Sequence, residues 1–218
     1  MKLFTLTVWL LGLLTIGSAT AQNKQDRPID AFSQIEASGA TTIYLTQGPQ
    51  TSVVVEAPAE AQSYIKTEVR NGVLRIYRES EGMTATLRNL LNNEKNGVKI
   101  YVTCPRLTAL KLSGATDVKS KTSFTADDFA IQASGASDVT MQLSAKSLTV
   151  HASGASDMHL SGQVERQQIH ISGSSDYHAE KLVSQQATVA ASGSSDAYVS
   201  AVRLSSHASG SSDIYNRK

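Results

Sequence analysis

The sequence predicts an all-β protein whose larger part is a right-handed parallel β-helix, or β-solenoid, with coils of about 19 residues. Two observations support this fold class. A short unit, S-G-[AS]-[ST]-D-x, occurs six times at nearly constant spacing, and apolar residues alternate with polar ones on both sides of each copy. The glycines of the unit, which we interpret as structural turn residues, are Gly114, Gly135, Gly154, Gly173, Gly193 and Gly210.

The N-terminus has the features of a secretory signal peptide over residues 1–21. Lys2 is followed by an apolar run, and Ala19 and Ala21 form the A-x-A pattern that signal peptidase accepts. The apolar run is shorter than the roughly 20 residues that a membrane-spanning helix needs. We therefore expect an exported protein, periplasmic, outer-surface or extracellular, with no membrane span after cleavage and a flexible N-terminal segment at residues 22–29.

Charge and cysteine content exclude several classes of protein. Cleavage of the leader removes Lys2 and no acidic residue, which leaves 19 of the 20 basic residues against 19 acidic ones. A neutral chain lacks the clustered basic surface on which nucleic-acid binding depends, so we expect no nucleic-acid partner. The one cysteine, Cys104, cannot form an intramolecular disulfide, and its apolar neighbours indicate a buried thiol.

Residues 30–105 are predicted to form a less regular, β-rich N-terminal subdomain. Its first segment, residues 35–45, matches the register of the later units, with Thr42 where they have aspartate, and is interpreted as a degenerate first coil. Residues 82–96 interrupt the pattern and could form either a short amphipathic helix, as a lid or partner-binding element, or a surface loop anchored by leucines. The further strand candidates, two of them joined by an Asn-Gly turn signal, are 51–56, 63–69, 73–78 and 98–104.

Residues 106–216 are predicted to form the solenoid subdomain. When the copies are aligned on glycine, the positions two and four residues before it are apolar, apart from Ser206, and the positions four and six after it are mostly apolar. This period of two indicates strands with one buried face, so each unit is a strand, a Gly-x-x-Asp turn, a strand and a further short strand. An ordinary β-sandwich would not keep the same residues at the same place in every unit.

Several segments taken together resemble a known family. They are F-x-x-I-x-x-S-G at 32–39, G-V-L-R-I-Y at 72–77, V-K-I-Y-V-x-x-P at 98–105 and L-x-x-L-x-L-S-G at 107–114, followed by the serial S-G-S-S-D copies. In this combination the chain resembles, from about residue 30 to residue 216, the putative auto-transporter adhesin, head GIN domain family of exported bacterial proteins. The resemblance implies a β-helical fold, a cell-envelope or extracellular setting and a role in adhesion, and it supplies no catalytic residues.

The predicted turns place one aspartate of each unit in a column. At the interstrand spacing of about 4.8 Å, neighbouring carboxylates repel each other. If the aspartates are structural turn residues, hydrogen bonds from turn N–H groups and from Ser or Thr hydroxyls would offset the repulsion. If they are metal ligands, a row of bound Ca²⁺ ions would offset it. The spacing differs from that of nonapeptide calcium repeats, which favours the structural role. The column consists of Asp117, Asp138, Asp157, Asp176, Asp196 and Asp213.

The histidines fall into two columns of the repeat. His151 and His170 are neighbours three residues before the glycine, and His159 and His178 are neighbours five residues after it. Each pair could bind a transition metal on an outer face, although duplication of the repeat also explains the pairs. Beyond Ca²⁺ at the aspartate column and metal at these pairs, no cofactor is predicted.

These observations predict a non-enzymatic protein. A catalytic site needs converging residues unlike their surroundings, whereas every coil offers the same Ser, Gly and Asp, so a polysaccharide-active enzyme is disfavoured. The long polar surface favours an adhesin-like binding module for a glycan or a protein on a cell surface. The alternative is a self-assembling envelope spacer, because an uncapped last coil would pair end to end into a homo-oligomer unless Arg217 and Lys218 guard it.

Overall fold

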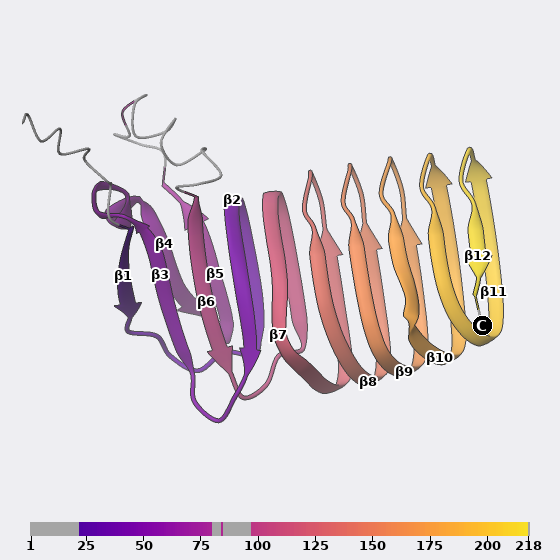
Figure 1. The fold of residues 1–218 in the computed structure, drawn as a ribbon, viewed down its shortest axis with the longest axis horizontal. Coiled ribbons are helices and arrows are strands. Elements are labelled where there is room, and N and C mark those ends of the chain that lie inside the picture. Colours follow the sequence, from indigo (N-terminus) through magenta and orange to yellow (C-terminus); the bar gives the residue numbers. More distant parts are fainter. Residues whose placement is uncertain (1–21, 80–83, 85–96, 218) are drawn as a thin grey trace, which may run out of the picture.

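A computed structural model describes residues 22–79, 84 and 97–217 of the chain, and the regular secondary structure of these residues is β-strand apart from one short 3-10 helix. The strands belong to one open sheet that extends along the molecule (Figure 1). The predicted all-β class is therefore confirmed. The predicted signal peptide at residues 1–21 and, apart from Thr84, the segment 82–96 lie outside the described residues.

The order of the strands across the sheet differs from their order in the chain. The elements are β1 (Gln22–Arg27), β2 (Gln34–Gln47), β3 (Ser52–Pro58), the 3-10 helix η1 (Ala59–Tyr64), β4 (Ile65–Arg70), β5 (Val73–Arg78), β6 (Val98–Cys104), β7 (Ala109–Ala133), β8 (Val139–Ala152), β9 (Met158–Ile171), β10 (Tyr177–Gly193), β11 (Ala197–Gly210) and β12 (Ile214–Asn216). Across the sheet the order is β1-β3-β6-β2-β7-β8-β9-β10-β11-β12, with β5 and then β4 as a branch from β2. The strands predicted at 73–78 and 98–104 are β5 and β6, whereas the segment predicted at 63–69 is divided between η1 and β4.

Residues 22–29, predicted to be a flexible segment, instead begin with strand β1. This strand pairs antiparallel with β3, with Gln22 opposite Pro58 and Arg27 opposite Val53. One guanidinium nitrogen of Arg27 also donates to the side-chain and backbone oxygens of Gln62, at 2.9 and 2.8 Å. Because β1 is held by backbone pairing and polar contacts, it shows no alternation of apolar residues that the sequence could reveal.

Each repeat unit stacks in parallel on the preceding one. Strands β2 and β7 to β12 pair in this way, and the predicted columns are in register, with Ile131 opposite Val150 and Val150 opposite Ile169. Figure 1 shows the resulting row of similar loops, each closed by a narrow turn at the same edge. Because β2 also pairs with β7 from Gln34 to Leu45, the two predicted subdomains share one continuous sheet.

Differences in repeat length are absorbed by bulges at one place in the coil. Between β7 and β8 the register shifts after Lys119, so that Ser123 lies opposite Gln142. Similar shifts follow His178 against β9 and Ala179 against β11. A bulge adds residues to one strand without disturbing the pairing beyond it. The glycine turns and the strand segments before them therefore stay aligned although the repeat length varies.

The interior of the stack is a narrow apolar core with one polar network. Alanines at the position two before the glycine, such as Ala133 and Ala152, are 3% exposed. The buried hydroxyl of Tyr177 donates to the side-chain carbonyl of Gln167 at 2.8 Å, and the amide of Gln167 donates to the Ser184 hydroxyl at 2.8 Å. Burial raises the pKa of Tyr177, so its phenol stays neutral. The network gives hydrogen-bond partners to the buried polar side chains of Tyr177, Gln167 and Ser184.

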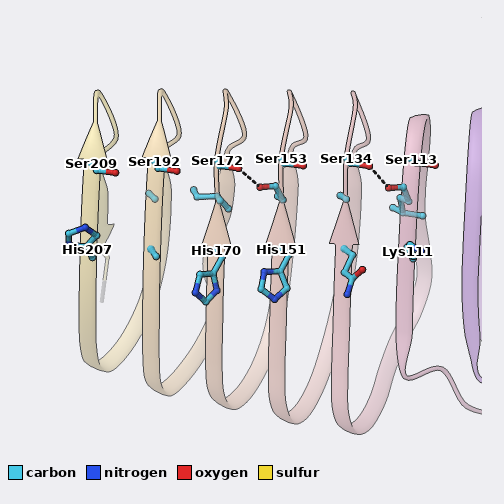
Figure 2. Close-up of a pocket in the computed structure, with 17 residues that line it drawn as sticks. Lys111, Ser113, Ser134, His151, Ser153, His170, Ser172, Ser192, His207 and Ser209 are labelled. Carbon is cyan, nitrogen blue, oxygen red and sulfur yellow. Dashed lines mark hydrogen bonds between the residues drawn. The ribbon is translucent and has the colours of Figure 1, made fainter.

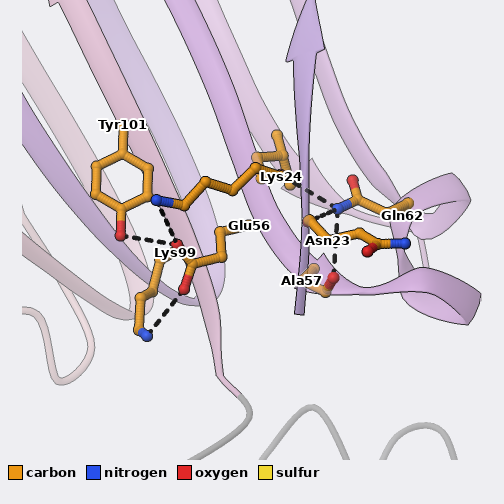
Figure 3. A network of polar contacts seen from close by, with 8 residues as sticks. Asn23, Lys24, Glu56, Ala57, Gln62, Lys99 and Tyr101 are labelled. Carbon is orange, nitrogen blue, oxygen red and sulfur yellow. Dashed lines mark hydrogen bonds and ion pairs between the residues drawn. The ribbon is translucent and has the colours of Figure 1, made fainter. Parts of the chain in front are cut away.

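The N-terminal part continues the stack with antiparallel ribbons. The first half of β2 pairs with β5, which pairs with β4, and the second half pairs with β6, which pairs with β3. Strands β1, β3 and β6 are tied together at Glu56, which accepts from Lys99 at 3.1 Å and from the Tyr101 hydroxyl at 3.0 Å and lies 3.3 Å from the Lys24 ammonium (Figure 3). Burial raises the pKa of Glu56, but these three contacts outweigh it and hold the pKa below its usual value.

Candidate functional site

The unit glycines stack on one another at the turns. At Gly135 φ is +84°, and a Cβ atom there would lie 2.5 Å from the carbonyl oxygen of Gly114. The same oxygen accepts the backbone N–H of Ala136 at 2.8 Å, and the equivalent bond recurs along the column. The turn therefore requires glycine for its left-handed backbone and for the close approach of the next coil.

The aspartate column lies just beyond the glycine turns. The backbone N–H of Asp196 donates to the Asp176 carboxylate, and that of Asp213 donates to the Asp196 carboxylate, both at 3.1 Å. Burial, together with the charge of Asp138, raises the pKa of Asp117, while Lys119 lowers it. Within the described part of the chain, no three His, Cys, Asp or Glu side chains are grouped as a metal site would require.

Hydroxyl groups at the turns bond to the backbone rather than to the aspartates. The Ser156 hydroxyl donates to the carbonyl oxygen of Ser153 at 3.2 Å and lies 3.4 Å from the backbone N–H of Ser137, which donates to it. The prediction that these hydroxyls donate to the carboxylates is wrong for Thr116, Ser137 and Ser156. Their hydroxyls point into the turn and donate to backbone carbonyl oxygens there. The buried column consists of Thr116, Ser137, Ser156, Ser175, Ser195 and Ser212.

The two histidine pairs lie on different sides of the turn and both are stacked. The rings of His151 and His170 have centroids 5.0 Å apart, and those of His159 and His178 are 4.8 Å apart. The second pair continues through Tyr198 and Tyr215 at 5.1 Å steps, with Arg217 over the Tyr198 ring. In this aromatic column every ring stacks on at least one neighbouring ring, so the contacts are those of a stabilising stack.

The first pair lies in a groove of about 590 Å³ that crosses five strands, from Lys111 on β7 to Ser209 on β11. Figure 2 shows a row of serines near the turns and, farther down the strands, a second row that contains His151, His170 and His207. Among the described residues that line the groove, none is acidic. Between the two rows lies the position two before the glycine, whose side chains, such as those of Leu112 and Ile171, are buried in the core. The serine row consists of Ser113, Ser134, Ser153, Ser172, Ser192 and Ser209.

The sequence did not indicate this groove. In the sequence the serine before each glycine stands out only as the start of the repeat unit, and His151 and His170 only as a possible metal-binding pair. A usable signal was present, because the positions one and three before glycine are polar in every unit apart from Ala190 and are therefore expected to face outward on the same side of the strand. The aspartates and the pair His159 and His178 do not line the groove.

One further feature limits the chemistry of the described residues, and it concerns Cys104. Cys104 is buried, as predicted, and burial raises the pKa of its thiol to about 11, which makes it a poor nucleophile at neutral pH. A search of the described residues for a helix long and apolar enough to cross a membrane finds none.

The fold is shared with solved structures of bacterial proteins. A protein described as a putative adhesin from Bacteroides fragilis aligns with a TM-score of 0.80 at 21% identity, over 91% of this chain and 98% of its own. A putative lipid binding protein from Parabacteroides distasonis aligns with a TM-score of 0.63 at 17% identity, over 90% of this chain and 98% of its own. A putative adhesin from Parabacteroides merdae aligns with a TM-score of 0.59 at 11% identity, over 92% of this chain and 98% of its own. At these identities the likeness shows the fold.

A family model describes nearly all of the sequence after residue 30. A comparison with curated proteins returned no match. The model described as "putative auto-transporter adhesin, head GIN domain" matches residues 31–218, which is most of the chain and includes every copy of the glycine–aspartate unit. The chain therefore belongs to the putative auto-transporter adhesin, head GIN domain family.

Proposed function

We propose that this protein is an exported, non-enzymatic binding module whose groove holds a hydroxyl-rich glycan on a cell surface. The observation that carries the proposal is the groove itself, about 590 Å³ in volume, with one outward serine from each coil along one side. Hydroxyl groups both donate and accept hydrogen bonds, which suits the hydroxyls of a sugar. The A-x-A leader and the adhesin description of the family support export and binding.

We further propose that the parallel coils form a right-handed β-solenoid that serves as the scaffold of this groove. The in-register stacking of β7 to β11 supports this scaffold. The glycines act as turn residues, and the aspartates act as backbone acceptors rather than as cation ligands. A chelator should therefore leave the melting temperature unchanged, and a fall in that temperature would instead show bound cations.

A binding role accounts for the groove better than catalysis does. The side chains that line it are Ser, His, Gln, Lys and small apolar residues, repeated from coil to coil. Catalysis on a glycan ordinarily uses a pair of carboxylates, and the lining has no carboxylate among the described residues. The repetition suits a ligand that is itself a repeating chain.

A glycan array tests this function with a blocked groove. We expect the mature protein to bind at least one array glycan, and the double variant Ser153→Tyr, Ser172→Tyr to lose that binding because two rings fill the groove. The control is Thr140→Tyr, which adds a tyrosine beside His159 outside the groove. Retention of binding by the double variant would place the ligand elsewhere. A protein that binds no glycan and scatters light as a stable dimer would favour the envelope spacer.

A further inference from the structure

We propose that the groove selects a linear anionic glycan, such as a chain of uronic acids, and binds it more tightly as the pH falls below neutral. This inference rests on the proposed glycan-binding function and deepens it. Three features of the groove support it: its ionisable side chains are all bases, its coils are spaced like the rings of a sugar chain, and its serine hydroxyls have unused hydrogen-bonding capacity.

The ionisable side chains of the groove are all bases. They are Lys111 at one end, the stacked pair His151 and His170 in the middle, and His207 at the other end. Histidine ordinarily gains its proton between about pH 8 and pH 5. Protonation would place positive charges 5.0 Å apart at His151 and His170. An anionic ligand along the groove would offset this repulsion, because opposite charges attract where like charges repel.

The neighbours of these histidines on the packed strands leave that charge uncompensated. Along the column His151 adjoins Gln132 and His170, and both His170 and His207 adjoin Ala190. The next outward column consists of Ala109, Ala130, Thr149, Gln168, Thr188 and Ser205, and none of these is charged. The nearest charged residues beyond it include Asp128 and Arg166, one of each sign, on either side of Ser147. Among the contacts of the described residues, Lys111 is the one base of the groove with an acidic partner, since Glu36 lies 3.3 Å from its ammonium.

The spacing of the coils suits a sugar chain better than a peptide. The groove runs across the strands, so its repeating groups recur at the interstrand distance of about 4.8 Å. An extended glycan advances by close to this distance with each pyranose ring, so one ring lies over one coil. An extended peptide advances by only about 3.4 Å per residue and would fall out of step.

The serine row has free capacity for a ligand. The hydroxyl of Ser134 donates to the Leu112 carbonyl at 3.3 Å and that of Ser172 to the Ala152 carbonyl at 3.5 Å, which leaves their oxygens as acceptors (Figure 2). Within the described part of the chain, the hydroxyls of Ser153 and Ser192 make no hydrogen bond. The serine row can therefore bind ring hydroxyls while the basic row binds carboxylates.

Isothermal titration calorimetry with a matched pair of probes tests the selectivity. The probes are an oligomer of galacturonic acid and the same oligomer with its carboxyls methyl-esterified, each titrated at about pH 5.5 and about pH 7.5, on either side of the ordinary histidine range. We expect the acid oligomer to bind roughly tenfold more tightly at the lower pH, from two or three exposed charge contacts. The ester should bind weakly and equally at both pH values. Equal affinity for acid and ester would overturn the proposal.

The second histidine pair provides a matched control. We expect His151→Gln, His170→Gln to remove most of the pH dependence and His159→Gln, His178→Gln to retain it, because only the first pair lines the groove. Loss in the second variant instead of the first would also overturn the proposal. Tighter binding of poly-glutamate than of the uronate oligomer would favour a peptide ligand and contradict it.

The two proposals fail in different ways. Binding of the neutral ester through the groove, with no gain for the acid form, would leave the glycan-binding function standing and refute only the anionic selectivity. Absence of binding for every arrayed glycan and both oligomers would refute the function as well.

Discussion

Gly135 shows that each turn requires glycine for two reasons, its backbone conformation and its lack of a side chain. Its φ of +84° is unfavourable for other residues, and the Gly114 carbonyl oxygen lies where a Cβ atom would point. Gly72 has a similar φ of +73°, but no atom lies within 4 Å of its Cβ position. A substitution at Gly72 therefore measures the cost of the left-handed backbone alone, whereas one at Gly135 measures that cost together with the steric clash against the neighbouring unit.

We predict that Gly72→Ala lowers the free energy of unfolding by about 1–2 kcal/mol, the cost of the left-handed backbone. Gly135→Ala should cost roughly twice as much or more, because the new methyl group must also displace the neighbouring coil. Urea unfolding of both variants measures the difference. Equal losses would mean that the coils are less closely stacked than the structure indicates.

The hydroxyl column supplies a second prediction at the residue scale. The Ser175 hydroxyl is buried and accepts the backbone N–H of Ser156 at 3.2 Å. Ser175→Ala should lower the free energy of unfolding by about 1–3 kcal/mol, because that N–H loses its partner. Ser175→Thr should retain most of it, since Thr116 occupies this column in an earlier coil. The exposed neighbour Ser174→Ala is the control, and an equal loss there would refute the role of the hydroxyl.

At the scale of elements, the repeat made the parallel strands predictable and left the connections between them hidden. The unit fixes the glycine turn and the alternation around it, so the register of Ile131 against Val150 follows from alignment alone. The bulge after Lys119 was not predictable, because it accommodates the extra residues of a longer repeat unit at a polar part of the strand, where no apolar pattern marks the register. Strand β1 was missed for a related reason, since its pairing with β3 depends on backbone groups that every sequence has.

The tie between β1, β3 and β6 gives a prediction that depends on pH. The folded-state pKa of Glu56 lies below its ordinary value, so its contribution to stability is present above the unfolded-state pKa of about 4.3 and is lost as the pH falls through the folded-state pKa. Glu56→Gln should therefore lower the free energy of unfolding by about 1–3 kcal/mol at neutral pH and by much less in acid.

Chemical unfolding at several pH values tests this tie between the strands. Glu60→Gln, on the exposed side of η1, is the matched control and should change stability little at any pH. A constant deficit for Glu56→Gln from neutral to acid pH would show that the carboxylate charge does not hold the three strands together.

At the scale of the whole molecule, stacking turns single residues into rows. One serine per unit and, in five of the six units, one basic or polar residue mean little alone, but the six aligned units present them as a groove of about 590 Å³. The sequence predicted the columns and not the groove, because whether an outward column lies beside a recess depends on how the coils bend at the turn. The aspartate column, which is present in all six units, and the aromatic column, which is present in four of them, lie outside the groove.

A crystal structure of the protein with the galacturonic acid oligomer tests our proposal that this groove is the ligand site. We expect one sugar chain lying across strands β7 to β11, with ring hydroxyls near Ser153 and Ser172 and a carboxylate beside His151 or His170. A sugar chain bound instead along the column of His159, Tyr198 and Tyr215, or an empty groove in crystals of a complex that calorimetry shows to be saturated, would contradict it.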